Sequence, residues 1–288
     1  MKSAPVAVLC LLVNALVWGV SWWPFRELKS LGLHPLWSTA IVYGFALAAI
    51  LIWRPKALKQ FLITPSLYWI ALGAGLTNAC FNWAVTIGDV VRLILLFYLM
   101  PIWAVLLARM VLKEPITRAA MVRIAIALVG AYIVLKPDSG GIAWPSSIAD
   151  WLAIAGGASF ALNNVFLRRE AAQPEAARAV AMFAGGAVFA AVLGAILASA
   201  ALVPWPPAPR ADWVIGALML SVVFLVANLS LQMGATSLPA NVTAVVMLTE
   251  ILFASGSAIV FGAEVLQLKT VIGGSLIVGA ALLATFWR

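Results

Sequence analysis

Long apolar stretches separated by short polar breaks run along the whole chain. A window of roughly 20 residues, the length that a helix needs to cross the hydrocarbon core of a bilayer, finds ten of them. They cover residues 5–23, 34–53, 65–88, 90–112, 118–136, 148–168, 178–202, 211–237, 240–262 and 268–287. Because backbone without hydrogen bonds cannot lie in lipid, closely joined stretches must be helices that pack as antiparallel neighbours. The pattern predicts an all-α polytopic membrane protein with ten transmembrane helices.

A polar stripe in the third stretch recurs in the eighth. Asn78, Asn82 and Thr86 are four residues apart, which places them on one face of a helix. An offset of 150 residues leads from them to Asn228, Gln232 and Thr236. Five spans in each half reverse the direction of the second half, which is the inverted repeat of many secondary transporters. We therefore expect a first five-helix repeat at 1–137, a linker at 138–147 and a second five-helix repeat at 148–288.

Composition and charge fit this interpretation. Hydrophobic residues make up 65% of the 288 residues and charged residues 10%, whereas charged residues form roughly a quarter of a soluble domain. The net charge of +8 does not indicate a nucleic-acid partner, because the cations lie in short loops and not in one patch. Twelve of the 18 Lys and Arg residues fall on the side of the N-terminus. This bias predicts that both termini are cytoplasmic, and we expect the first stretch to be an uncleaved span.

Residues typical of catalysis are scarce. The single histidine, His34, begins a predicted span and has no second ligand at metal-binding spacing. Gly273-Gly274-Ser275 lacks the nucleophile elbow of a hydrolase, and no nucleotide-binding loop is present. Cys10 and Cys80 both lie inside apolar stretches, as buried structural thiols do. The sequence predicts no enzyme, no cofactor and no metal.

Amides inside the spans are the strongest candidates for function. Each of them must find a partner, either across a helix contact or in a water-filled cavity. One interpretation is that they only join helices. The other is that the amides line a polar cavity, which accounts for more of them than helix contacts do. The set comprises Asn14, Asn78, Asn82, Asn163, Asn164, Asn228 and Gln232.

Glu250 is the one acid deep inside a predicted span. It either contacts a substrate amine or carries a proton, or it is a structural carboxyl held by Thr249 and Ser255. Rings close to the polar positions are candidate cavity residues, although each could equally serve packing: Trp18, Phe81, Tyr98, Trp103 and Phe160. Pro101 interrupts the fourth span and predicts a kink that suits a gate or simple curvature.

Three segments resemble one family. They are VWGVSW at 17–22, LLFYLMPIWAVLLARMVLKEPIT at 95–117 and its echo VVMLTEILFASGSAIVFGAE at 245–264. Together they resemble the drug/metabolite transporter superfamily, EamA type, and the chain is most similar to the bacterial aromatic amino-acid exporters. Two positions depart from the pattern: Ile251 stands where Pro commonly follows the acid, and Phe160-Ala161 where the second copy can keep Trp.

The resemblance implies a central substrate cavity surrounded by spans one, three, four, six, eight and nine. It places Trp18, Ser21 and Trp22 on the first-span motif, Tyr98 and Pro101 on the fourth-span motif, and Glu250 on the acid of the second copy. We expect the substrate-binding set to comprise Trp18, Ser21, Trp22, Asn78, Phe81, Asn82, Tyr98, Pro101, Phe160, Asn163, Asn228, Gln232 and Glu250.

The resulting hypothesis is a secondary transporter of the bacterial inner membrane that exports small metabolites, aromatic and other amino acids foremost, by alternating access. Its partners are the small-molecule substrate and the lipid bilayer, and a monomer is compatible with the sequence. An exporter of cationic drugs is the alternative within transport. A lipid-handling membrane enzyme or a scaffold is the alternative of another class.

Overall fold

The computed structural model describes residues 4–113, 115–137, 144–237, 246–247, 249–261 and 267–286, and every regular element among them is a helix. The helices before residue 138 are α1 (Ala4–Val20), α2 (Trp22–Ser30), α3 (Pro35–Trp53), α4 (Lys56–Ile63), α5 (Leu67–Ile87), α6 (Val90–Phe97), α7 (Met100–Leu107), the π-helical turn η1 (Ala108–Leu112) and α8 (Arg118–Leu135). Those that follow are α9 (Ile148–Arg169), α10 (Glu175–Ser199), α11 (Ala211–Ser237), α13 (Thr249–Val260) and α14 (Leu268–Phe286).

Within the described residues, seven helical stretches are long and apolar enough to cross a membrane. They are Pro5–Ser30, Pro35–Trp53, Leu67–Ile87, Val90–Leu112, Arg118–Leu135, Glu175–Ser199 and Ala211–Leu231. They confirm that the chain is a polytopic membrane protein. The spans expected at 148–168, 240–262 and 268–287 correspond to α9, α13 and α14. The count of ten spans and the inverted repeat stay predictions, and residues 240–245 of the ninth span lie outside the described residues.

The first span is longer than expected, since α2 continues α1 as far as Ser30. The extension is held by cations that bind the last carbonyls of α5. Arg26 donates from Nε to the Val85 carbonyl at 2.8 Å and from Nη2 to the Gly88 carbonyl at 2.6 Å. Lys29 donates to the Thr86 carbonyl at 2.9 Å. Positive charge suits a helix C-terminus, where carbonyl groups lack partners in the helix.

The fourth span breaks between α6 and α7 at Tyr98 and Leu99. Pro101 has no N–H to offer the carbonyl of Phe97, so the helix is interrupted in the turn before the proline. The kink expected at Pro101 is therefore present in the backbone, although the proline side chain itself lies outside the described residues. The carbonyl of Phe97 faces α9 so closely that a Cβ on Gly157 would overlap it. A glycine is required there because the two backbones touch.

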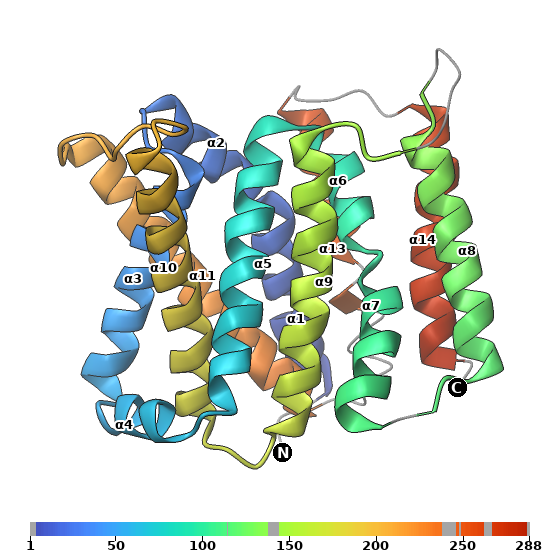
Figure 1. The fold of residues 1–288 in the computed structure, drawn as a ribbon, viewed down its shortest axis with the longest axis horizontal. Coiled ribbons are helices and arrows are strands. Elements are labelled where there is room, and N and C mark those ends of the chain that lie inside the picture. Colours follow the sequence, from blue (N-terminus) through green and yellow to red (C-terminus); the bar gives the residue numbers. More distant parts are fainter. Residues whose placement is uncertain are drawn as a thin grey trace.

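The central helices come from both halves of the chain. In Figure 1, α5 and α9 stand side by side in the middle, α10 and α3 lie on one side, and α8 and α14 form a pair at the opposite edge. Backbone contacts hold the centre, since a Cβ on Gly73 would lie 2.8 Å from the backbone nitrogen of Asn163. The N-terminal end of α1 and the C-terminal end of α14 lie at the same end of the molecule (Figure 1). Their cytoplasmic location stays a prediction.

Candidate functional site

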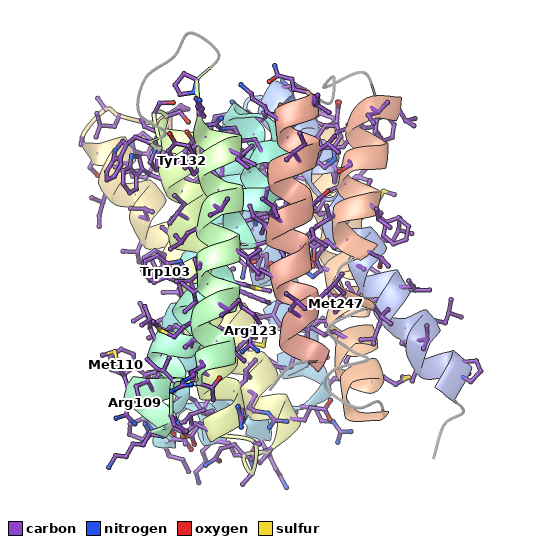
Figure 2. All side chains as sticks on the ribbon, turned by 90° about the vertical axis from the view of Figure 1, so that its right-hand side faces the viewer. Trp103, Arg109, Met110, Arg123, Tyr132 and Met247 are labelled. Carbon is purple, nitrogen blue, oxygen red and sulfur yellow. The ribbon has the colours of Figure 1, made fainter. Side chains whose placement is uncertain are left out.

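Tyr98 and Glu250 meet between the two halves of the chain. Tyr98 follows the last residue of α6, and Glu250 lies in the first turn of α13. The Tyr98 hydroxyl donates to Glu250 Oε2 at 3.1 Å and lies 3.4 Å from the Met247 carbonyl oxygen. The exposed fractions of the two side chains are 4% and 8%. In Figure 2, Met247 lies about halfway between the two ends of the molecule, so the pair is at mid-depth.

The carboxyl group of Glu250 has no cationic neighbour in the part of the chain that the structure describes. Burying a carboxylate without a cation is costly, so the group must be neutral or must face a partner that the described residues do not supply. If Glu250 is only structural, the sequence predicts that the hydroxyls of Thr249 and Ser255 bond its carboxyl group. Thr249 instead donates to the Val246 carbonyl at 2.6 Å, and the hydroxyl that reaches the carboxyl is that of Tyr98.

Aromatic rings from several helices form a contiguous cluster beside this pair. We call it the ring cluster; it comprises Trp18, Phe81, Phe97, Tyr98, Phe160 and Phe224. Phe97 is its centre, with ring centroids 5.0 Å from Phe81 and 5.5 Å from Phe160. Phe81, Phe97 and Phe224 are buried, whereas Trp18 and Phe160 are half-buried. The expected rings Trp18, Phe81, Tyr98 and Phe160 are thus brought together.

The three residues of the first-span motif have different contacts. The Ser21 hydroxyl donates to the Trp18 carbonyl at 2.8 Å, a bond within the helix. Trp22 Nε1 donates to the Ser257 hydroxyl at 2.9 Å and so joins α2 to α13. Trp18 alone of the three packs in the ring cluster, where its ring contacts Phe224 at 4.8 Å between centroids.

The amides of α5 bind α3. The Tyr43 hydroxyl donates to Asn78 Oδ1, while Asn78 Nδ2 donates to the Ala74 carbonyl at 2.7 Å. Asn82 Nδ2 donates to the Thr39 hydroxyl at 3.0 Å. These are bonds between helices, as the packing interpretation describes. A substrate contact of Asn78 or Asn82 stays a prediction.

In the part of the chain that the structure describes, three buried amide oxygens have no hydrogen-bond partner: Asn14 Oδ1, Asn82 Oδ1 and Asn163 Oδ1. The Asn14 side chain also donates from Nδ2 to the Ala227 carbonyl at 2.9 Å, which joins α1 to α11. Each unpaired oxygen can accept one more bond from water or from a ligand. Asn228 is half-buried on α11. The side chain of Gln232 on the same helix lies outside the described residues.

Sequence reasoning missed Tyr43, Thr39, Phe97 and Phe224. Thr39 and Tyr43 are four residues apart, and this spacing was the available signal for a polar stripe that faces the stripe of α5. Phe97 and Phe224 carry no comparable signal, because one more phenylalanine in an apolar span is ordinary.

A second polar group lies at the end of the molecule where α6 and α9 begin. Arg92 binds both carboxylate oxygens of Asp150, at 2.9 and 3.0 Å, and also the Val134 carbonyl at 2.9 Å. The backbone N–H groups of Ser146 and Ser147 donate to Asp150 as well. The pair lines a cavity of about 190 Å³ whose rim includes Lys136 and Lys269. The buried carboxylate of Asp150 is therefore paired with a cation and hydrogen-bonded at both oxygens.

Metal binding finds no support among the described residues, where no group of three or more His, Cys, Asp or Glu side chains could hold an ion. The chemistry available at the centre is therefore that of one carboxyl, one phenol, amide oxygens and aromatic rings. Groups of these kinds are found in sites that bind small molecules.

Comparison with known proteins agrees with this. Residues 5–136 match the model of the EamA-like transporter family. A solved structure titled "Crystal structure of protein" superimposes with a TM-score of 0.62 at 18% sequence identity, covering 99% of this chain and 98% of that one; this likeness concerns the fold alone. No curated protein matches the chain. Residues 5–136, somewhat less than half of the chain, are therefore similar to the EamA-like transporter family.

Proposed function

We propose that the chain is a secondary transporter of the bacterial inner membrane that exports amino acids with aromatic side chains. The family match over residues 5–136 supports transport. It covers nearly the same residues as the first predicted repeat, which also supports a second repeat of similar length. The observation that carries the substrate class is Glu250, a buried carboxyl beside the ring cluster and without a cation among the described residues.

The carboxyl group is suited to an ammonium group. An ion pair of the substrate ammonium with Glu250 would supply the positive charge that the described part of the protein lacks there. Tyr98 would remain bonded to the second carboxylate oxygen or turn to the substrate. The unpaired Asn14 Oδ1 is a further acceptor, one helical turn from Trp18 on the same face of α1.

The ring cluster is suited to the side chain of the substrate. Aromatic pairs stabilise one another by edge-to-face or offset stacking beyond the area they bury. Trp18 and Phe160, the half-buried members, can take up a substrate ring with small rotations, while Phe81 and Phe97 support them from behind.

The location of the pair between the halves supports alternating access. Tyr98 belongs to the first predicted repeat and Glu250 to the second, so a rocking motion of the repeats changes the distance between them. The helix is broken at Tyr98 and Leu99, directly at this contact, where a hinge would let the two repeats move.

Transport into proteoliposomes tests the proposal. The purified chain would be given labelled phenylalanine, tyrosine, tryptophan, alanine and a tetraphenylphosphonium cation, each with and without a pH gradient. We expect counterflow of the three aromatic amino acids above that of alanine. Absence of aromatic amino-acid transport by folded protein would exclude the proposed substrate.

Organic cations are the second candidate, because Glu250 would bind a cation that has no carboxylate as well. The same panel separates the two. Transport of tetraphenylphosphonium that free phenylalanine does not inhibit would favour the cationic-drug exporter.

A further inference from the structure

The short helix α4, which was expected to be a loop, has three distinct faces. Ala57 is buried, and Phe61 on the same face packs edge-on against Tyr68 with ring centroids 5.2 Å apart. Leu58 and Leu62 are exposed on a second face, with exposed fractions of 38% and 55%. The third face carries the polar residues Lys56, Lys59 and Gln60, all exposed. A helix turns 100° per residue, which separates these three groups and places the exposed Ile63 at the end of the polar face, seven residues after Lys56.

Its place in the molecule matches a helix at the surface of a bilayer. In Figure 1, α4 lies across the ends of α3 and α5 and does not run along them. Exposed tryptophans stand on both sides of it in the chain, namely Trp53 at 77% and Trp69 at 50%. Tryptophan collects where hydrocarbon meets headgroups. An amphipathic helix at this level lies in the membrane plane, with its apolar face toward the acyl chains.

Three cations lie on α4 or directly before it. Arg54, Lys56 and Lys59 are exposed, and none of them has an ion-pair partner among the residues that the structure describes. The helix also contacts α10, and the nearby ends of α9 and α10 carry further cations. Across 54–69 and 168–178 the chain has the cations Arg54, Lys56, Lys59, Arg168, Arg169 and Arg178, against the acids Glu170 and Glu175.

Phe166 of α9 completes the neighbourhood. Trp69 stacks on its ring with centroids 5.5 Å apart, and the Arg169 guanidinium stands over it at 5.6 Å. Phe61, Leu67 and Phe166 belong to one packed cluster, so α4 is fixed to the ends of α5 and α9. The cations and exposed leucines of α4 are therefore presented in a rigid arrangement.

We propose that this surface, made of Arg54, Lys56, Lys59, Leu58 and Leu62, binds the headgroup of an anionic phospholipid. The cations would hold the phosphate and the leucines would contact the acyl chains. A soluble acidic protein fits less well, because the apolar face lies directly beside the cations and at the level of the bilayer. Anionic lipid binds such basic segments through the negative surface potential of the leaflet.

Lipid binding by the purified full-length chain tests this proposal. The chain would be placed in nanodiscs of phosphatidylcholine with a titrated fraction of fluorescent phosphatidylglycerol. Enrichment of the anionic lipid would be measured for the wild type and for K56Q/K59Q. Since each basic residue at an anionic surface contributes about a fivefold factor in binding, we expect the variant to bind about 25-fold more weakly. Because both lysines are exposed, its unfolding temperature in pure phosphatidylcholine should equal that of the wild type.

Two matched variants make the result specific. K113Q/R118Q removes the same charge at the same end of the molecule, where η1 ends and α8 begins, and should bind phosphatidylglycerol as the wild type does. K56R/K59R keeps the charge on α4 and should also bind normally. Unchanged binding by K56Q/K59Q would overturn the proposal. Equal weakening by K113Q/R118Q would also overturn it, since binding would then follow net charge and not α4.

Discussion

Two sets of polar side chains inside the membrane differ in how completely they are satisfied. On α5, Asn78 is bonded at both ends of its amide, to Tyr43 of α3 and to the Ala74 carbonyl, whereas Asn82 binds Thr39 of α3 and leaves only its Oδ1 unpaired. At the centre, Glu250 has one phenol and no cation in the described structure. Both sets are buried, and both were expected to line one cavity. The difference teaches that an intramembrane polar residue suggests function when its bonding capacity is left unused.

Arg92 and Asp150 extend the comparison to charge. Their carboxylate is as buried as that of Glu250, with exposed fractions of 2% and 8% for the two residues, but it has a bidentate arginine and two backbone N–H groups. If completeness of pairing decides the role of a buried carboxylate, removing Arg92 should destabilise the protein, because Asp150 loses its cation. Neutralising Glu250 should not destabilise it.

The largest expected effect is that of Arg92→Gln on stability. Removing one partner of a buried ion pair leaves an uncompensated charge and costs 3–5 kcal/mol in general. We expect about 3 kcal/mol here, because Ser146 and Ser147 still donate to Asp150. Unfolding in a urea series in mild detergent measures this cost. The double variant R92Q/D150N should recover at least half of it, and a single variant as stable as the wild type would contradict the comparison.

Glu250→Gln should lower transport without lowering stability, whereas Arg92→Gln lowers stability. Loss of a charged hydrogen bond to the substrate costs about 1.5–3 kcal/mol, which corresponds to a decrease in transport efficiency of roughly 10- to 150-fold. The free energy of unfolding should stay the same or rise, because no buried carboxyl remains. Counterflow in proteoliposomes and unfolding in detergent give the two numbers. Normal transport by a stable E250Q protein at every pH would show that Glu250 is structural.

Two buried tyrosines allow the same substitution to be made at both sets of polar residues: Tyr43 donates to Asn78, and Tyr98 donates to Glu250. Tyr43→Phe leaves Asn78 Oδ1 without its donor, and such bonds between membrane helices contribute about 0.6–1.7 kcal/mol. We expect a loss of stability of about 1 kcal/mol with an unchanged KM for transport. Tyr98→Phe removes the donor to Glu250 and should change KM or its pH dependence with a smaller loss of stability. Equal effects of the two substitutions on KM would remove the distinction.

Much of the fold could be predicted from the sequence, because an apolar segment of roughly 20 residues is recognisable as a membrane span. Glu250 could also be found, since a lone acid in an apolar span is conspicuous. The orientation of Asn78 and Asn82 could not be predicted. Helical spacing shows that they share a face, but their neighbour depends on how α5 is rotated in the bundle. That rotation is fixed by backbone contacts such as Gly73 with Asn163, which no periodicity encodes.

The helix α4 and the extent of α2 were missed for a related reason. The eight residues of α4, KALKQFLI, are too few to be recognised as a span, and the packing of Phe61 on Tyr68 stabilises them as a helix. Arg26 and Lys29 looked like the end of a span, yet their bonds to the carbonyls of α5 keep the helix going to Ser30. Tertiary contacts override local signals at both places.

The smallest expected effect concerns His34, a partly satisfied polar group that directly precedes the span Pro35–Trp53 of the structure. Its Nδ1 accepts from the Leu36 N–H at the start of α3. Burial, and then the charge of Lys29, lower the pKa of His34 from 6.5 to about 4. The folded state thus prefers the neutral ring, so this contribution to stability is complete above pH 6.5 and is lost as the pH falls toward 4. Because the ring is only half-buried, we expect a loss of at most about 1 kcal/mol at pH 5.5.

H34N keeps a capping acceptor without titrating, and its unfolding free energy should fall less than that of the wild type between pH 7 and pH 5.5. Parallel pH profiles for the two proteins would mean that His34 does not contribute to acid sensitivity.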